Sequence, residues 1–351
     1  RPGLLDYIRG RNEAWVRCCD YRLSFLADAV MYLFPRRVFR SELRRARRVL
    51  DERLAQGRRI VSLYILSTDG LGHMLSPAAI EVELARLDDW IERALYDHGG
   101  ELEMVVASDH GLGCLPAGCA RVTRFDLRAV LRAAGLRVGR RLRRSGDCVV
   151  PGLGLLDVAR LYAYDTGTRD RVVAALCGRP EIELVIVRDE DRLRVLSAGG
   201  SAEIRQRPAA DGQAAYSYTC MTGDPLGLAP ACAALWAAGR LSSDNFARAA
   251  DWLRASADLP YPAAPPRLWR GLFVLTREQP DVVLSLNERC YAGSSLLGRF
   301  VSMQGTHGGL HRRVSETFAM STGVDFDGPT TLPDVAARLR SAYGWAADRA
   351  C

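Results

Sequence analysis

The stretch that decides the fold class is residues 60–111, IVSLYILSTDGLGHMLSPAAIEVELARLDDWIERALYDHGGELEMVVASDHG. Its two ends, residues 60–66 and 102–107, are short apolar runs of the kind that forms buried strands. Between them, a Ser-Pro pair opens a predicted helix with apolar residues at three- and four-residue spacing, which ends in the His-Gly-Gly of residues 98–100. Strand, helix and strand, with a polar loop after each strand, is the βαβ pattern of a parallel sheet. Ligands bind such sheets at the carboxyl ends of the strands, where both loops lie.

The rest of the chain predicts a core domain with a smaller domain inserted into it. Hairpin signals between residues 183 and 205 differ from the βαβ segment, and a proline-rich stretch at 259–266 leads back to strand-like sequence. We expect an α/β fold with a largely parallel central sheet flanked by helices, formed by residues 1–114 and 281–351, and an inserted α+β domain at 115–280. Further predicted elements are helices at residues 12–54 (with a break near Pro35), 125–134, 243–255 and 332–343, and strands at 281–286 and 316–320.

Composition narrows the class of protein. The chain has 351 residues, of which 48% are hydrophobic and 25% charged, values that are ordinary for globular proteins and exclude wholesale disorder. It contains no run of about 18 apolar residues, so we expect no membrane-spanning helix. Its ten cysteines form no CxxC pair, which leaves the redox compartment open. Oligomeric state and localisation are not predicted, and because the chain begins with Arg1 a signal peptide cannot be assessed.

The net charge of +7 comes entirely from arginine, since the chain contains no lysine. Complete use of one basic residue indicates a GC-rich coding bias rather than selection for phosphate contacts. Arg36, Arg40, Arg44 and Arg48 recur every four residues, a spacing that places them on one helix face. Because no nucleic-acid-binding module accompanies them, we interpret this face as solvated and predict no specific nucleic-acid partner.

Histidine placement carries the functional signal. The chain has five histidines, and four lie in glycine-containing motifs: DGLGH at residues 69–73, SDHG at 108–111 and GTHGGLH at 305–311. The first two motifs follow the predicted strands and each carries an aspartate. Imidazole and carboxylate without cysteine suit zinc or manganese, and glycine beside a ligand lets the loop turn sharply. The predicted metal ligands are Asp69, His73, Asp109, His110 and His307.

Two histidines stand apart from this set. His98 lies at a predicted helix end, where an imidazole interacts with the last carbonyls. His311 allows two interpretations. It could contact the metal ligands without binding the ion itself, or it could be a surface histidine next to Arg312 and Arg313.

The motifs DxxGH, SDHG and GTHG, in this order, resemble the alkaline phosphatase superfamily and, within it, the type I phosphodiesterase/nucleotide pyrophosphatase branch. The resemblance covers residues 60–113 and 302–343 by motif. It implies two divalent metal ions, zinc or manganese, and a small-molecule phosphoester substrate. Asp69, His73 and His307 would hold one ion, and Asp109 and His110 would help to hold the second. Cofactor-independent phosphoglycerate mutases share two of the motifs, but the 197 positions between His110 and His307 favour the phosphodiesterase branch.

The chain departs from the family pattern before DxxGH. The family has a further aspartate ligand and a threonine or serine nucleophile there, farther upstream than the 68 residues that precede Asp69. We therefore expect a chain that lacks its first strand and nucleophile, the latter lying upstream of Arg1, and that is weakly active or inactive alone. The alternatives are a sulfatase, phosphonate hydrolase or phosphotransferase on the same scaffold, or a non-catalytic module that retains metal.

Overall fold

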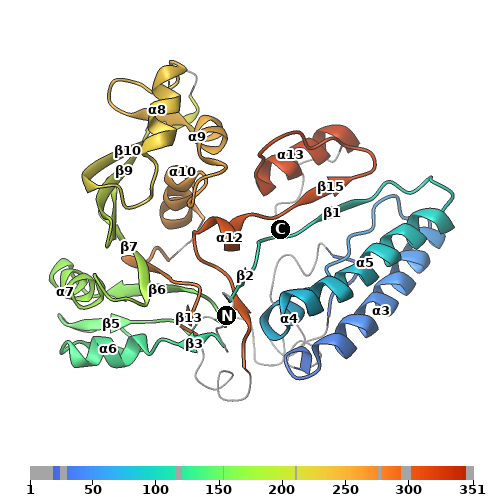
Figure 1. The fold of residues 1–351 in the computed structure, drawn as a ribbon, viewed down its shortest axis with the longest axis horizontal. Coiled ribbons are helices and arrows are strands. Elements are labelled where there is room, and N and C mark those ends of the chain that lie inside the picture. The colour runs from blue at the N-terminus through green and yellow to red at the C-terminus, as the bar shows by residue number, and fades with distance from the viewer. Residues whose placement is uncertain are drawn as a thin grey trace.

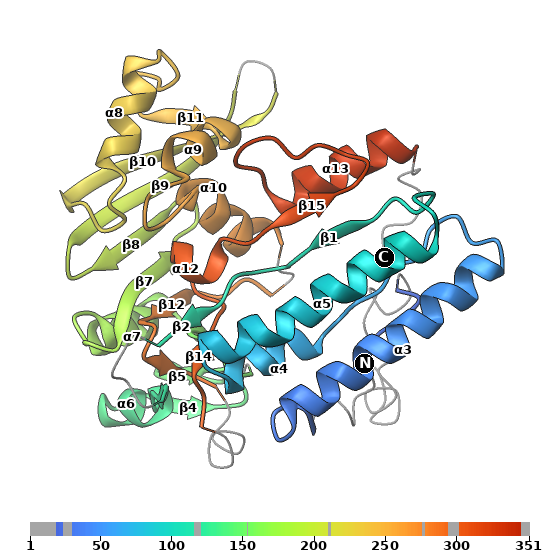
Figure 2. The same ribbon diagram turned by 45° about the vertical axis from the view of Figure 1, so that its right-hand side comes forward.

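The structure is a computed structural model that describes residues 19–23, 30–115, 121–152, 154–209, 212–275, 278–293 and 302–344. Helices α3 (Pro35–Ala55), α4 (Ser67–Met74) and α5 (Pro77–Asp97) lie together at one side of the molecule, and a large sheet with its own helices forms the other side (Figures 1 and 2). A two-stranded ribbon of β1 (Val105–Ala107) and β15 (Ala319–Ser321) runs between these parts, with helix α13 (Leu332–Tyr343) along it. The α/β class predicted from the sequence is therefore confirmed.

The large sheet has nine strands in the order β11-β10-β9-β8-β7-β12-β6-β5-β4. All neighbouring pairs are antiparallel except β4 with β5, so the prediction of a largely parallel central sheet is wrong. Short turns at residues 189–192 and 198–199 join β7, β8 and β9, and connections this short permit only antiparallel pairing. The strands are β4 Arg137–Gly139, β5 Asp147–Val149, β6 Val158–Ala163, β7 Ile182–Arg188, β8 Leu193–Ser197, β9 Gly200–Pro208, β10 Ala214–Gly223, β11 Phe246–Arg248 and β12 Val282–Leu286.

Both faces of this sheet are covered. In β7, Leu184 and Ile186 belong to one hydrophobic cluster, and Val185 belongs to another, because successive side chains of a strand point to opposite faces. A strand buried on both sides contains a continuous apolar run, as residues 184–187 (LVIV) of β7 do. The first cluster takes in residues of α8 (Ala229–Ala237), α9 (Ala249–Ser256) and α10 (Ala264–Trp269), and the second takes in residues of α6 (Leu127–Ala133) and α7 (Thr166–Leu176).

Of the predicted βαβ segment, the helix forms, the second strand forms over three residues, and the first strand does not form. Helix α5 spans Pro77–Asp97 as expected. Residues 60–66 form no strand. Their β pairing among the described residues is limited to one isolated bridge between Leu63 and Tyr21. Strand β1, Val105–Ala107, pairs antiparallel with β15, Ala319–Ser321, rather than parallel with residues 60–66. An apolar run becomes a strand only when a partner is beside it, and that depends on segments distant in the sequence.

Helix α3 (Pro35–Ala55) begins at the proline where the sequence predicted a break, and it packs on α4 (Ser67–Met74) and α5. Leu43 of α3 and Leu71 of α4 share one apolar cluster. The arginine face is not purely solvated, because Arg40 makes a bidentate ion pair with Glu83 of α5, whose side chain is buried.

The remaining elements connect these parts. Strand β2 pairs antiparallel with β14, so that Gly113 faces Thr306. Strand β12 lies between β6 and β7, so the sheet contains residues from both sides of position 280/281; the division into a core and an inserted domain stays a prediction.

In the part of the chain that the structure describes, no helix is long and apolar enough to cross a membrane. The elements not yet given are β2 Gly113–Cys114, β3 Thr123–Arg124, η2 (a π-helix) Arg270–Val274, β13 Cys290–Tyr291, β14 Gly305–Thr306 and α12 Arg312–Ser315.

Candidate metal centre

Asp69 and His73 lie on helix α4, whereas the sequence predicted a loop after residues 60–66. Their four-residue spacing puts both side chains on the same face, one turn apart. The glycines between them serve close packing rather than a sharp turn. A Cβ at Gly72 would lie 2.9 Å from a methyl group of Leu112, and one at Gly70 would lie 3.0 Å from the Met31 side chain.

His307 joins these two residues from the other end of the chain. It follows β14, and its backbone makes a parallel bridge with Leu156, just before β6. Nε2 of His307 lies 2.8 Å from Oδ1 of Asp69, and Nε2 of His73 lies 3.4 Å from the same oxygen. One donor atom of each residue lies within 4.8 Å of the others, so these three side chains can hold a metal ion. We call them the Asp-His-His group.

Neighbouring groups fix the orientation of these side chains. Nδ1 of His73 donates to the backbone oxygen of Gly305 at 2.9 Å, which leaves Nε2 as the atom that faces Asp69. The hydroxyl of Tyr32 donates to Oδ2 of Asp69 at 3.0 Å, so that Oδ1 is the oxygen turned to both histidines. Partners of this kind set ring orientation and tautomer in metal-binding histidines and hold ligating carboxylates in place.

Burial and charge oppose each other in the Asp-His-His group. Burial raises the pKa of Asp69, but the hydrogen bonds from His307 and His73 outweigh it and hold that pKa well below its usual range. Burial lowers the pKa of His73, yet its hydrogen bond with Asp69 and that residue's charge leave the pKa raised. For His307 burial dominates, and its pKa is lowered. An ionised carboxylate beside a readily deprotonated imidazole is the state that a metal ion requires.

Asp109 and His110 lie beside this group without belonging to it. The ring of His110 stacks on that of His307, with centroids 3.9 Å apart and an interplanar angle of 15°. The Asp109 side chain is 58% exposed, and the Tyr64 hydroxyl lies 3.5 Å from its Oδ2. Among the described residues, the only set of three or more metal-ligating side chains close enough for one ion is the Asp-His-His group. The SDHG motif therefore borders the centre, but its two side chains, predicted as metal ligands, do not converge with the other three.

His311 and His98 lie outside the centre. The Nδ1 atom of His311 accepts from the backbone N–H of Arg313 at the start of α12, and its ring meets that of Tyr261 edge-on at 5.5 Å. His98 ends α5, with its Nε2 3.5 Å from a carboxylate oxygen of Asp51.

No protein-family model, curated protein or solved structure matches this chain. The assignment of the centre therefore rests on the chemistry and geometry of its own residues.

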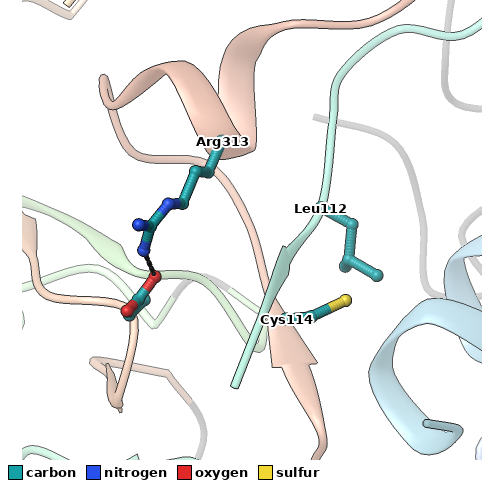
Figure 3. A pocket seen from close by; sticks show the side chains of 4 residues that line it. Leu112, Cys114 and Arg313 are labelled. Carbon is teal, nitrogen blue, oxygen red and sulfur yellow. Dashed lines mark hydrogen bonds and ion pairs between the residues drawn. The ribbon is translucent and has the colours of Figure 1, made fainter. Parts of the chain in front are cut away.

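The segment after His110 borders a pocket of about 630 Å³, which is lined by Leu112, Cys114, Glu288 and Arg313. Figure 3 shows Cys114 projecting from β2, Leu112 from the segment just before it, and Arg313 from the start of α12. Arg313 is paired with Glu288 at 2.5 Å. Strand β2 begins three residues after His110 and pairs with β14, the strand that directly precedes His307, so the segment that lines the pocket is joined to the segments that carry both histidines.

Three residues around the centre escape sequence reasoning: Tyr32, Tyr64 and Asp157. None lies in a histidine motif, and Asp157 is separated from His307 by 150 positions. Burial raises the pKa of Asp157 to about 7. No sequence signal distinguishes these residues from ordinary core tyrosines or loop aspartates, because their roles depend on which segments meet in space.

Proposed function

We propose that the protein is a metal-dependent hydrolase of phosphoric esters, of the phosphodiesterase/nucleotide pyrophosphatase type. The observation that carries this proposal is the oxygen of Asp69 shared between the facing Nε2 atoms of His73 and His307. Two imidazoles and one carboxylate leave an open coordination position on a tetrahedral ion, which is the pattern of catalytic rather than structural zinc sites.

The side chains fit the ions that the sequence motifs imply. A nitrogen and oxygen donor set without sulfur suits zinc and also manganese. In the proposal, the Asp-His-His group holds one divalent ion, and Asp109 with His110 contributes to a second. Bound metal would supply Lewis-acid stabilisation of phosphoryl oxygen and activation of a hydroxyl nucleophile. The proposal assigns the nucleophile to none of the residues named above, and we therefore expect hydrolysis to be slow.

The surrounding residues would position the substrate. The pocket that Leu112 and Cys114 border would accept the part of the ester beyond the phosphorus, since Leu112 lies two residues after His110 in the chain. Arg313 brings positive charge to its rim, although Glu288 neutralises part of it. A charged or polar leaving group would therefore meet a mixed, not a purely cationic, surface.

A second candidate is a module that retains one metal ion without catalysis. The exposure of Asp109 favours it, because the described residues then offer a complete ligand set for only one ion. Stoichiometry separates the two: the hydrolase binds two ions per chain, and the non-catalytic module binds one.

The test is zinc- and manganese-dependent hydrolysis of bis(p-nitrophenyl) phosphate, with p-nitrophenyl sulfate as the competing ester. We expect slow phosphodiester cleavage that disappears in Asp69→Asn and His110→Ala and persists in His98→Ala, a histidine far from the centre. Cleavage that is equal in wild type and Asp69→Asn would refute the proposal. Two bound ions without any hydrolysis would contradict the catalytic part, and preferred cleavage of the sulfate would contradict the substrate class.

A further inference from the structure

The start of β6 holds the turn that carries His307. Asp157, the residue before β6, donates its backbone N–H to the backbone oxygen of His307 at 3.0 Å. Its own backbone oxygen accepts from the N–H of Leu286 in β12 at 2.7 Å. The ligand turn is thereby tied to the middle of the nine-stranded sheet rather than to its own neighbours in the sequence.

The side chain of Asp157 closes the same turn from the other end. Its carboxylate accepts a hydrogen bond from the backbone N–H of Gly309. A Cβ at Gly309 would lie 3.1 Å from Oδ2 of Asp157 and 3.0 Å from Oγ of Ser285, so the turn fits over the carboxylate because glycine stands there. Gly308, with φ of 108°, supplies the positive dihedral that reverses the chain. The sequence His-Gly-Gly thus matches the space above Asp157.

The burial of Asp157 and Ser285 in this arrangement lowers the stability of the folded chain. Asp157 is 2% exposed, and its Oδ1 has no hydrogen-bond partner among the described residues. The nearby hydroxyl of Ser285 is equally buried and also lacks one there. An unpartnered buried polar atom destabilises a protein, and each such group in a native structure requires an explanation.

We propose that Asp157 is a positioning residue for the metal centre: by holding both ends of the 307–309 turn, it aims Nε2 of His307 at Asp69. The inference rests on the proposed metal centre for its functional meaning, while the clamp itself is a property of the turn. Outer partners of metal ligands change metal affinity by about 10- to 100-fold when they are removed.

The experiment compares Asp157→Ala and Asp157→Asn with wild type in the full chain. The matched control is Asp147→Ala. Asp147 is also buried and also accepts backbone N–H groups, those of Arg143 and Arg144, but it lies beside the opposite end of β6. Two quantities are measured: amide hydrogen exchange of a peptide covering residues 305–309, and the zinc dissociation constant by competition with a chelator.

We expect Asp157→Ala to speed exchange in the 305–309 peptide and to weaken zinc binding by about tenfold or more. Asp157→Asn, whose amide oxygen still accepts from Gly309, should stay within about threefold of wild type on the same scale. Asp147→Ala should change neither quantity. Unchanged exchange in Asp157→Ala, or equal losses in the alanine and asparagine variants, would overturn the inference. A wild type that binds no zinc, with faster exchange in Asp157→Ala, would refute the metal centre and leave the clamp standing.

Discussion

The buried carboxyl of Asp157 makes folding stability depend on pH in a direction opposite to that of most carboxylates. Burial raises its pKa from 3.8 to about 7 in the folded chain. Between these values the folded state holds a proton that the unfolded state has released, so the free energy of unfolding falls as pH rises. The contribution of this group is fully present below about pH 4 and is lost once the pH has passed 7.

The change in the free energy of unfolding follows from the pKa shift of Asp157. A shift of about three pKa units corresponds to about 4 kcal/mol over the whole pH range, and roughly 2.5 kcal/mol of this is lost between pH 5 and pH 8. Asp157→Asn removes the titrating group and keeps the acceptor for Gly309. We therefore predict that this variant gains about 2.5 kcal/mol relative to wild type when the pH is raised from 5 to 8.

The assay is urea unfolding of both proteins in the presence of a chelator, at several pH values between 5 and 8. Asp147→Asn is the control, since hydrogen bonds from Arg143 and Arg137 hold the pKa of Asp147 below its usual range. That carboxyl is ionised in both states across this interval, so the stability difference of the control variant should be flat. If the Asp157→Asn difference is equally flat, Asp157 is ionised at pH 5 in the folded chain and the burial argument is refuted.

Three further outcomes follow from single contacts. Tyr32→Phe, which removes the hydroxyl on Asp69, should weaken zinc binding by about tenfold with unchanged circular dichroism; an unchanged dissociation constant would contradict the role given to that hydroxyl. Gly111→Ala would place a Cβ 2.2 Å from the backbone oxygen of Glu316, so the free energy of unfolding in urea should fall by several kcal/mol. A decrease below about 1 kcal/mol would contradict this close packing. Trp252→Ala leaves a cavity at a fully buried position and removes the hydrogen bond to the backbone of β10, which should lower the free energy of unfolding by about 3–5 kcal/mol in the same assay. A near-neutral change would show that the hydrophobic cluster containing Leu184, Ile186 and Trp252 is not close-packed.

The sequence predicted local features well and long-range ones poorly. Apolar spacing identified α5, and the strands β7 and β8 emerged as apolar runs separated by a turn. The pairing of residues 60–66 was mispredicted because nothing in IVSLYIL states which segment lies beside it. Asp69 and His73 do lie within reach of one ion, as the motif resemblance implied, although they stand on a helix instead of a loop.

The order of the motifs identified His307 as a ligand. No local spacing links it to Asp69, because only the fold brings the two side chains together. The support that orients these ligands was not foreseen at all. Tyr32 and Asp157 act through a hydroxyl and a turn contact that arise from tertiary packing, and a single sequence carries no pattern for either. Conversely, Asp109 belongs to the predicted motif, but its side chain is exposed beside the centre and not gathered into the Asp-His-His group.

The most direct test of the metal centre is X-ray absorption at the zinc edge of the purified, zinc-loaded chain. The structure predicts a first coordination shell of nitrogen and oxygen at about 2.0–2.2 Å with the multiple scattering of two imidazoles, reduced in His73→Ala and His307→Ala. Sulfur at about 2.3 Å would place the ion on the cysteines, and a shell unchanged by both variants would place it elsewhere. Either result would contradict the assignment of Asp69, His73 and His307 as its ligands.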